Sequence, residues 1–478
     1  MRSKNNTGWA EEELAEVDLG DERLNKRLIH LCGRFSDAPE SPVNQACVDW
    51  PETKAAYRFF QNESVDSDTI LAAHRGRTVR RAETHGTILA LQDSSHFIYT
   101  SHPKTEGLGE ISMKKGRNVK EIHSRGLTMH ACLAVTTEGL PLGLLSHKIS
   151  VREGSSTPLA RGGRDRLPIE KKESFRWLEA LGDTTEAMRG CRTVTVCDRE
   201  SDMYDFFKLA KELESRVLVR ASADRTINRK SRYAEKDVVK LWEHVGDRPQ
   251  AGEFKIEVPR KSKSKHSSLR PARSATVTVR FGPFRMNPPR NHPKQKNEEL
   301  PDIEMNAIHV LEENPPEGEE AIEWMLLTNL EVTSFEQAYE KVRWYGLRWR
   351  IEMFFKVLKS GFRVEACRLA HGERLARYLT VMSIVAWRLF MITILARADP
   401  NQCSSCLLAH NEWRILVRKA SGSRHLPERP PTMKEAVAYI AKLGGHLGRK
   451  RDGPPGTLTL WRGWKRLNDL VEGARIGL

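Results

Sequence analysis

Residues 192–222 of this 478-residue chain read RTVTVCDRESDMYDFFKLAKELESRVLVRAS, and this stretch decides the fold class. Its ends, RTVTVC and RVLVR, are short runs rich in β-branched residues, which is typical of buried strands. The segment between them, DMYDFFKLAKEL, has the apolar spacing of a helix. A strand, a helix and a second strand in this order predict an α/β core.

The segments before this stretch extend the same core. GTILALQD (86–93) is predicted to be a strand, and LTMHACLAVTTEGLPLGLLSHKIS (127–150) a hairpin that turns at Thr137, Glu138 and Gly139. ESFRWLEALGDTTEAM (173–188) has helical spacing. The predicted order up to residue 222 is therefore three strands, a helix, a strand, a helix and a strand.

Residues 222–331 interrupt this pattern, and we interpret them as an inserted β-subdomain. Strands are predicted at 274–281 (SATVTVRF), 304–311 (EMNAIHVL) and 323–330 (EWMLLTNL). Polar, basic and Pro-rich connections lie at 260–274 (RKSKSKHSSLRPARS) and 287–296 (NPPRNHPKQK). These cationic loops are either linkers or arms that contact phosphates.

Residues 1–84 are predicted to be a helical unit. Its helices are DERLNKRLIHLCGRF (21–35), PETKAAYRFFQN (51–62) and DTILAAHRGRTVRRAETH (68–85), the last running just past the unit. The first helix places three leucines on one side: Leu24, Leu28 and Leu31. The last carries four arginines, which either contact DNA phosphates or form a solvated charged face: Arg75, Arg77, Arg80 and Arg81.

Residues 373–478 are also predicted to be helical. YLTVMSIVAWRLFMITILA (378–396) is as apolar as a membrane span. Arg388 near its middle would cost about 2.5 to 3.5 kcal/mol on insertion scales, so we predict a buried helix and no membrane contact. Two later segments carry apolar stripes that form either a core or a dimer interface: Val437, Ile440 and Leu443, then Leu460, Trp464, Leu467 and Val471.

The composition favours a protein of the cell interior with a polyanionic partner. Lys and Arg total 78 against 63 Asp and Glu, and the formal net charge of +15 suits nucleic acid. The N-terminus has no apolar segment of the signal-peptide kind, so we expect a cytoplasmic location with the eight cysteines reduced. Cys403, Cys406 and His410 have no second pair of ligands, and no structural zinc is expected.

Three acidic residues on separate elements are candidates for chemistry. Asp93 and Asp198 end predicted strands, where α/β enzymes place their sites, although a strand-end Asp is often only a turn or cap residue. The third is Glu352 in YGLRWRIEMFFKVLKSG (345–361), a predicted helix in which one acid lies among four cations.

This predicted helix gathers charged residues on one side. At about 100° per residue, Glu352 shares an arc of roughly 80° with an aromatic hydroxyl and three cations: Tyr345, Arg348, Lys356 and Lys359. An ion pair of Arg348 with Glu352 on a solvated face would explain only two of them. Three carboxylates can hold two divalent ions about 4 Å apart for phosphoryl transfer, while cations bind neighbouring phosphates. The pattern therefore predicts a phosphodiester site.

At these residues the sequence resembles the DDE transposases of bacterial insertion sequences. The similar subgroup is the hairpin-forming, cut-and-paste one of the insertion sequence four family, typified by the transposase of transposon five. CDRESD (197–202) is similar to its D-R-E-A-D box, with Ser201 in place of alanine. Its Y-(2)-R-(3)-E-(6)-K signature is matched with every spacing intact by Tyr345, Arg348, Glu352 and Lys359. LGDERLNKRL, AAYRFFQN, AYIAKLGGHLGRKRDG and WRGWKRL extend the similarity toward both ends.

The resemblance implies an α/β RNase H-like catalytic core with an inserted β-subdomain (222–331). It implies a helical DNA end-recognition domain (1–84), a DDE catalytic domain (85–372) and a helical dimerisation domain (373–478). The implied metal ligands are Asp93, Asp198 and Glu352, which would bind Mg²⁺ or, in its place, Mn²⁺. The implied DNA-binding residues are Tyr345, Arg348, Lys356, Lys359, Arg220, a basic active-site residue, and Trp324, which matches the tryptophan that receives a flipped base.

The implied reaction is DNA transposition. Water nicks each end, the freed 3′-OH attacks the opposite strand to form a hairpin, and the reopened ends join target DNA. The implied partners are double-stranded DNA, as terminal inverted repeats and target, and a second copy of the chain in the synaptic complex. Two alternatives stay open: a DNA-binding regulator derived from a transposase, which needs no carboxylates, and another RNase H-like metal-dependent nuclease, which cuts without strand transfer.

Overall fold

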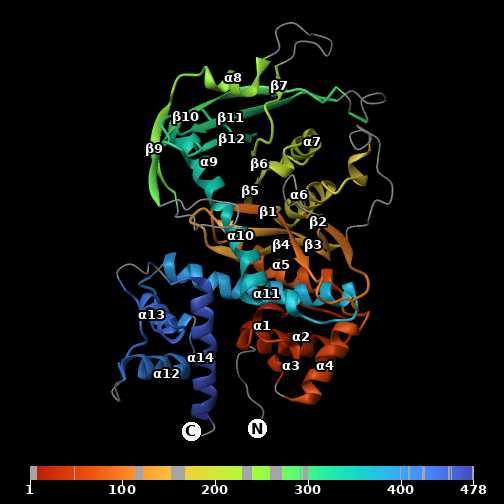
Figure 1. The fold of residues 1–478 in the computed structure, drawn as a ribbon, viewed down its shortest axis with the longest axis vertical. Coiled ribbons are helices and arrows are strands. Elements are labelled where there is room, and N and C mark those ends of the chain that lie inside the picture. The colour runs from red at the N-terminus through yellow and green to blue at the C-terminus, as the bar shows by residue number, and fades with distance from the viewer. Residues whose placement is uncertain are drawn as a thin grey trace. The chain divides into compact units, whose positions relative to one another are not determined.

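The structure is a computed structural model, and its chain divides into two compact units (Figure 1). The first comprises Met1–Ile88, Ser94–Ser155 and Trp349–Leu478, and the second Leu89–Asp93 and Ser156–Arg348. The residues that the structure describes are 8–47, 49–113, 122–151, 167–228, 239–258, 272–290, 292–293, 300–398, 400–406, 408, 410–422, 426–449, 453 and 455–475.

A sheet forms the centre of the second unit. Its strand order is β1, β5, β6, β12, β11, β10, β9, and β1 (Thr87–Ile98) contributes Leu89–Asp93 to this unit. β5 (Arg192–Cys197) runs parallel to β6 (Arg216–Arg220), and α7 (Tyr204–Glu212) connects them. The strand-helix-strand prediction for 192–222 is therefore confirmed.

The segment predicted as an inserted β-subdomain extends this sheet. β12 (Glu323–Thr328) pairs antiparallel with β6, and β11 (Ile303–Leu311), β10 (Arg273–Met286) and β9 (Gly252–Val258) follow as antiparallel neighbours. The three strands predicted here are confirmed. Four elements of this segment were not predicted: β9, β7 (Thr226–Ile227), β8 (Val239–Lys240) and α8 (Leu241–Gly246). Of the two basic segments, residues 260–271, 291 and 294–296 lie outside the described residues.

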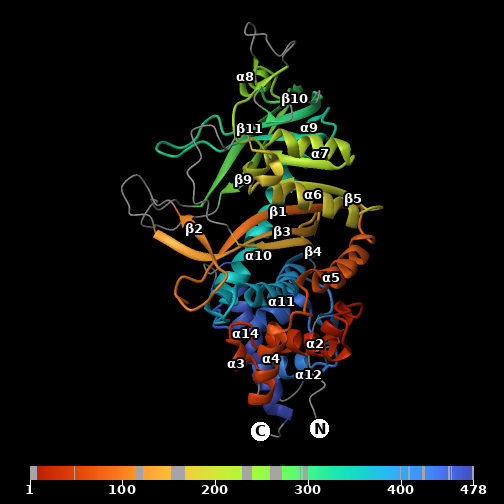
Figure 2. The same ribbon diagram turned by 90° about the vertical axis from the view of Figure 1, so that its right-hand side faces the viewer.

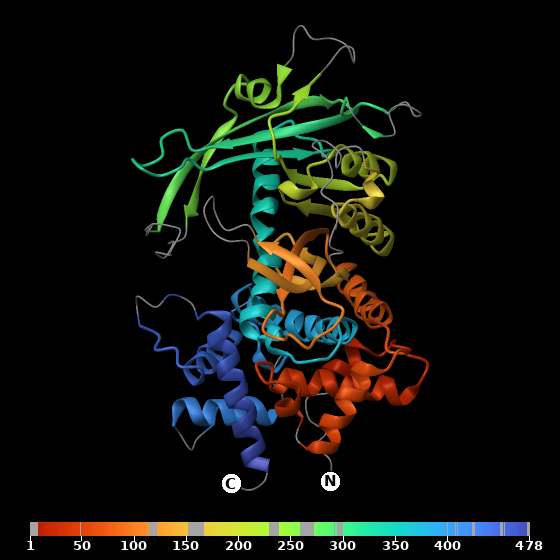
Figure 3. The ribbon, with the colours of Figure 1, turned by 45° about the vertical axis from the view of Figure 1, so that its right-hand side comes forward.

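Helices cover both faces of the extended sheet. α6 (Phe175–Ala187), α7 and α8 share one apolar core with β6, β11 and β12, in which Trp177, Phe206 and Leu241 meet Met325 and Leu327. α9 (Phe335–Leu347) carries Tyr345, whose ring contacts Trp324 on the other face of β12. Figure 3 shows α8 and α9 on opposite sides of these strands.

In the first unit, β2 (Gly109–Met113), β3 (Ile122–Thr136) and β4 (Pro141–Ser150) form an antiparallel arrangement in which β3 pairs with both others. The β3–β4 turn lies where it was predicted, with Gly139 at φ 92°. Only β2 was not predicted. α5 (Ser67–Ala82) and α11 (Gly372–Ala398) pack on β4 (Figure 2).

The N-terminal helices begin at aspartate caps. α2 (Glu22–Asp37), α4 (Trp50–Gln61) and α5 each start after an Asp whose carboxylate accepts a backbone N–H of the first turn: Asp21, Asp49 and Asp66. Such caps satisfy N–H groups that have no partner within the helix. α1 (Gly8–Glu13) and α3 (Val43–Ala46) are shorter. The helices predicted at 21–35, 51–62 and 68–85 are confirmed.

α11 contains the apolar stretch that resembles a membrane span. It is the one helix in the described part of the chain that is long and apolar enough to cross a membrane, and its apolar window is 83% buried inside the protein. The guanidinium of Arg388 lies over the Trp9 ring at 4.8 Å from its centroid. The prediction of a buried helix is therefore confirmed.

The C-terminal helices use their apolar stripes to pack on one another. α12 (His410–Ser421), α13 (Met433–Leu443) and α14 (Thr457–Arg475) share a core that contains buried Ile440, Leu460, Leu467 and Val471. Val437, Leu443 and Trp464 are partly buried against it. Most of both stripes is thus occupied within the chain.

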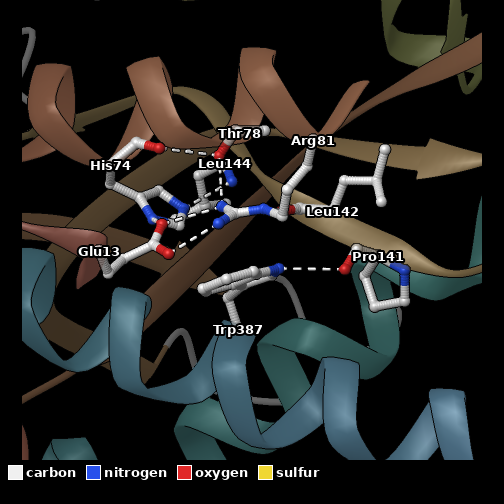
Figure 4. A network of polar contacts seen from close by, with 8 residues as sticks. All are labelled: Glu13, His74, Thr78, Arg81, Pro141, Leu142, Leu144 and Trp387. Carbon is white, nitrogen blue, oxygen red and sulfur yellow. Dashed lines mark hydrogen bonds and ion pairs between the residues drawn. The ribbon is translucent and has the colours of Figure 1, made fainter. Parts of the chain in front are cut away.

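A buried polar cluster joins α1, α5, β4 and α11 (Figure 4). Both carboxylate oxygens of Glu13 accept from the Arg81 guanidinium, at 2.7 and 2.8 Å, and Oε1 lies 2.6 Å from His74 Nδ1. The Leu144 amide donates to His74 Nε2, so Nδ1 carries the proton and donates to Glu13. Arg81 also covers the Trp387 ring at 4.4 Å. Arg81 was predicted to contact DNA or solvent, and it instead has a structural role.

Candidate active site

Asp93 lies in the middle of β1 and not at the end of a strand, as was predicted. The apolar run stops at Asp93, but the strand continues to Ile98 because polar side chains join it to β3. Ser94 Oγ lies 2.8 Å from His130 Nδ1, and His96 Nδ1 lies 2.9 Å from Thr128 Oγ1. The end predicted from the loss of hydrophobicity, Asp93, therefore lies five residues before the observed end of the strand, Ile98.

Asp198 directly follows β5 and caps a short 3-10 helix, Arg199–Ser201. Its Oδ1 accepts the Glu200 N–H at 2.9 Å, so it does have the cap role that strand-end aspartates often take. Buried Ser201, which replaces alanine of the family box, donates to the Asp198 carbonyl at 2.9 Å. The extra hydroxyl is thus satisfied and helps to fix the backbone of Asp198.

Asp202, the last residue of the CDRESD box, binds residues of the loop after β6. Asp202 has a fully buried side chain and accepts from the Ser222 N–H at 2.6 Å and from its hydroxyl at 2.9 Å. Arg225 forms an ion pair with the same carboxylate. Sequence reasoning did not assign Asp202 a role, although its place in the CDRESD box marks it.

Arg220, Trp324 and Tyr345 form a cycle of contacts that is closed through the backbone of Glu323. Tyr345 on α9 meets the Trp324 ring at 5.6 Å between centroids and hydrogen bonds with the Arg220 side chain. Arg220, at the end of β6, donates through Nη2 to the carbonyl of Glu323 at 2.9 Å, and Trp324 follows that residue. Trp324 is only partly buried, so its ring is both held and accessible.

Charges around Tyr345 place Asp198 and Arg348 near this cycle. Burial raises the pKa of the Tyr345 phenol, while the positive charges of Arg348 and Arg220 act in the opposite direction. The negative charge of Asp198 raises it further. Burial lowers the pKa of Arg220, and Arg199 and Arg348 add to that effect by like-charge repulsion.

Arg348 also contacts Asp93. Its Nη1 lies 3.4 Å from Asp93 Oδ2, and the two side chains are 13% and 16% exposed. The second unit therefore gathers six of the predicted site residues around the ends of β5, β6 and β12: Asp93, Asp198, Arg220, Trp324, Tyr345 and Arg348.

The other predicted site residues belong to the first unit. Glu352 is in the first turn of α10 (Trp349–Lys356) and is half-buried. Lys356 is exposed. Lys359 lies over the Phe97 ring at 5.3 Å, and burial lowers the pKa of its amine. Glu352 follows Arg348 by four residues, and Arg348 itself has helical dihedral angles.

The single regular helix predicted over 345–361 is wrong at its C-terminal end. α10 stops at Lys356, and Val357–Gly361 forms a π-helical turn. A wider turn changes the rotation per residue, so the arc derived at about 100° per residue does not hold for Lys359. The last residue of this turn is Gly361, where a Cβ would collide with the Trp461 ring of α14. Such turns are frequent at functional sites.

The aspartates have the chemistry of a hard-cation site. Carboxylate oxygens are the ligands that Mg²⁺ and Mn²⁺ prefer, and the strands that carry Asp93 and Asp198 are neighbours in the sheet of the second unit. Within the described residues, no three Asp, Glu, His or Cys side chains are grouped as around a metal ion. The second unit therefore supplies two carboxylates of a predicted set of three.

Comparison with protein families gives three matches in chain order. Residues 6–65 match a family described as "Transposase DNA-binding", and residues 174–388 one described as "Transposase DDE domain". Residues 384–477 match the "Transposase Tn5 dimerisation domain". Over residues 6–65 and 174–477 the chain is therefore similar to the domains of a Tn5-like DDE transposase. DNA binding, a divalent-metal nuclease or transposase activity and homodimer formation are the properties that these domains support.

The three matched regions correspond to distinct sets of helices and strands in the structure. The DNA-binding match spans α1 to α4 of the first unit, and the dimerisation match spans the end of α11 with α12 to α14. The DDE match contains Asp198, Arg220, Trp324, the Tyr345 signature and Glu352, and it begins after Asp93. Assignment of Asp93 therefore rests on its contact with Arg348.

Proposed function

We propose that this transposase binds the terminal inverted repeats of its own element, cuts them through a hairpin intermediate and joins the freed ends to target DNA. The observation that carries the proposal is the contact of Arg348 with Asp93, close to the cycle of Arg220, Trp324 and Tyr345. It joins signature residues to a strand carboxylate within one folded unit.

In this proposal, Asp93, Asp198 and Glu352 hold the metal ions in an RNase H-like core, with Mg²⁺ as the natural cofactor and Mn²⁺ as a substitute. Bound there, the ions would activate the attacking oxygen and stabilise the leaving oxygen. Support for Glu352 as the third ligand comes from its place one helical turn after Arg348. The extended strands of 222–331 are the inserted β-subdomain.

The cations have the task of holding the bent DNA end. Arg348 and Arg220 offer planar donor groups for phosphates, and Lys356 and Lys359 add charges beyond Glu352. A hairpin requires a strand to turn back on itself, and one base must leave the stack at a cost of a few kcal/mol. The accessible Trp324 ring would offset this cost by about 1 to 3 kcal/mol of stacking.

The domain boundaries and partners follow. Residues 1–84 recognise the DNA end, 85–372 carry out catalysis and 373–478 dimerise, so that two copies pair two ends in a synaptic complex. The protein acts on DNA in the cytoplasm. Light scattering with and without end DNA would test pairing, and a complex that holds one copy of the chain and one end would contradict it.

Incubation with Mg²⁺ and a supercoiled plasmid that carries the element's inverted repeats tests the whole proposal. The expected products are nicked ends, then hairpin ends, then joined molecules. Binding without cleavage would identify a DNA-binding regulator. Cleavage without hairpins or joining would identify another metal-dependent nuclease.

A further inference from the structure

The residue before Trp324 is held by contacts that the proposed reaction does not require. Glu323 Oε1 accepts from Trp242 Nε1 at 2.9 Å and lies 2.8 Å from His309 Nε2. Trp242 belongs to α8 and His309 to β11, so two elements converge on one carboxylate. His309 is 7% exposed and Glu323 43% exposed.

Glu323 has a third partner, which binds its backbone carbonyl. It accepts from Arg220 Nη2 at 2.9 Å, and Arg220 also hydrogen bonds with Tyr345. The backbone that carries Trp324 is therefore bound to a residue of the proposed site, while the side chain of Glu323 is bound elsewhere. Both contacts restrict the same stretch of β12.

Strand geometry puts these two sets of contacts on opposite faces of the sheet. Successive side chains of a strand alternate, so Glu323 shares a face with Met325 and Leu327, which pack with Leu241 of α8. Trp324 points to the other face, where it meets Tyr345 of α9. The contacts of the Glu323 side chain on the α8 side therefore restrain the strand that presents the indole on the other face.

We propose that Glu323, held by Trp242 and His309, is a positioning residue that presents Trp324 to the unstacked base. This inference rests on the proposed function, because it assumes that Trp324 receives that base. Glu323 touches no reacting atom. It acts by keeping the start of β12 in one place while the DNA end bends.

The test uses the full-length protein and a DNA end that carries 2-aminopurine at the base next to the scissile bond. Nicking and hairpin formation are followed on gels, and emission of 2-aminopurine reports whether the base is unstacked and stacked on the indole. Glu323→Ala removes both side-chain contacts, and Trp242→Phe removes one while keeping a ring. Glu323→Gln keeps an acceptor oxygen and is the conservative rescue, and Glu257→Ala, an exposed glutamate of β9, is the matched control.

We expect Glu323→Ala to nick at the wild-type rate and to form hairpins about five- to tenfold more slowly, which is the loss expected for two hydrogen bonds. Its 2-aminopurine signal should change toward that of Trp324→Ala. Trp242→Phe should show a smaller effect of the same kind, and Glu323→Gln and Glu257→Ala should match the wild type.

Three results separate the outcomes. If Trp324→Ala slows hairpin formation and Glu323→Ala does not, the positioning role is wrong and the proposed function stands. If Trp324→Ala has no effect, the base-binding role of the tryptophan fails first. If Glu323→Ala slows nicking and hairpin formation equally and lowers the unfolding midpoint, Glu323 has a purely structural role and the inference is overturned.

Discussion

Two Arg–carboxylate clusters in this protein use the same chemistry for different ends. In the first unit, Glu13 receives two guanidinium hydrogen bonds from Arg81, at 2.7 and 2.8 Å, and its side chain is 7% exposed. In the second unit, Arg348 reaches Asp93 by one contact of 3.4 Å. The first pair is bidentate and short, and the contact of the second pair is longer.

The surroundings of the two clusters differ in the same way. His74, Thr78 and Trp387 complete the Glu13 cluster, and Gly143, at φ 153°, leaves no space for a Cβ against Thr78. In the second unit, Arg348 and Arg220 lie close to the Tyr345 phenol, and the buried Nε of Arg220 has no hydrogen-bond partner among the described residues. A cluster that is saturated with hydrogen bonds stabilises a fold, whereas clustered positive charge favours an anionic ligand.

The largest expected effect separates the clusters by activity. Asp93→Ala, Asp198→Ala and Glu352→Ala should each reduce nicking by at least about a thousandfold, since one carboxylate of the proposed metal site is lost. Binding of the DNA end, measured by gel shift, should stay within about twofold, because recognition lies elsewhere. Nicking at the wild-type rate by any one variant would remove that residue from the site.

The second effect is on stability and concerns the saturated cluster. Glu13→Ala leaves Arg81 without its partner in a buried setting, and the free energy of unfolding should fall by about 3 kcal/mol. Urea unfolding monitored by circular dichroism would measure it, with exposed Glu83→Ala as the control. A change below about 0.5 kcal/mol would show that the cluster does not stabilise the fold.

The sequence predicted the core elements because their apolar patterns are strong. The β5–α7–β6 unit, the β3–β4 hairpin and the three strands of 222–331 lie where periodicity placed them. Periodicity failed where polar residues replaced the pattern without ending the element, as after Asp93 in β1. β9 was missed although its sequence, GEFKIEV, alternates apolar and charged residues as a half-buried strand does.

The candidate site was predicted by motif and not by pattern. Spacing identified Tyr345, Arg348 and Glu352, and the structure adds contacts that no local pattern contains, such as Arg348 with Asp93 across 255 residues of sequence. The close approach of Gly361, the last residue of the π-helical turn, to the Trp461 ring joins residues that are 100 apart by sequence number (461 − 361). Long-range packing of this kind cannot be inferred from a helix read in isolation.

The third effect concerns the partly exposed indole of Trp324, which contacts Tyr345 in the second unit. Trp324→Ala should nick at the wild-type rate and form hairpins about tenfold more slowly, if roughly 1.4 kcal/mol of stacking is lost from that step alone. An abasic site at the unstacked position should partly rescue the variant. A variant that melts at lower temperature, or forms hairpins normally, would identify Trp324 as a core residue.

The fourth effect tests whether the cations serve DNA or the fold. Arg348→Ala and Lys359→Ala should slow hairpin formation or strand transfer by several-fold more than nicking, because a phosphate contact matters most when the terminal nucleotide is held bent. Time courses resolved on gels, with exposed Arg343→Ala as control, would show the difference. Equal slowing of every step would indicate a general DNA-binding role instead.

The smallest effect is a pH dependence confined to the saturated cluster. The groups that face His74 are Glu13 from α1, Arg81 from its own helix and His147 from β4, while α11 presents the uncharged Trp387. Burial lowers the pKa of His74 below its ordinary value. The Leu144 N–H already donates to Nε2, so a proton added to Nε2 would point at another donor.

The direction of the pH effect follows from these pKa values. Since the folded pKa of His74 lies below the unfolded value of about 6.5, its contribution is present above that pH and is lost as the pH falls below it. Burial acts to raise the pKa of Glu13, but His74 and Arg81 outweigh it and lower the pKa to about 2, so its contribution is lost as the pH falls below 4.5. Both losses lie on the acid side, and they occur in succession.

We therefore expect His74→Gln to flatten the decrease in unfolding free energy as the pH falls below about 6.5, while the decrease below pH 4.5 persists. Urea unfolding at half-unit pH steps would measure this, with exposed His85→Gln as the matched control. If both histidine variants follow the wild-type curve, His74 is protonated equally in the folded and unfolded chains. The stability of the cluster would then come from the Glu13–Arg81 ion pair alone. In that respect it would be similar to the Asp93–Arg348 pair, which is also one arginine with one carboxylate.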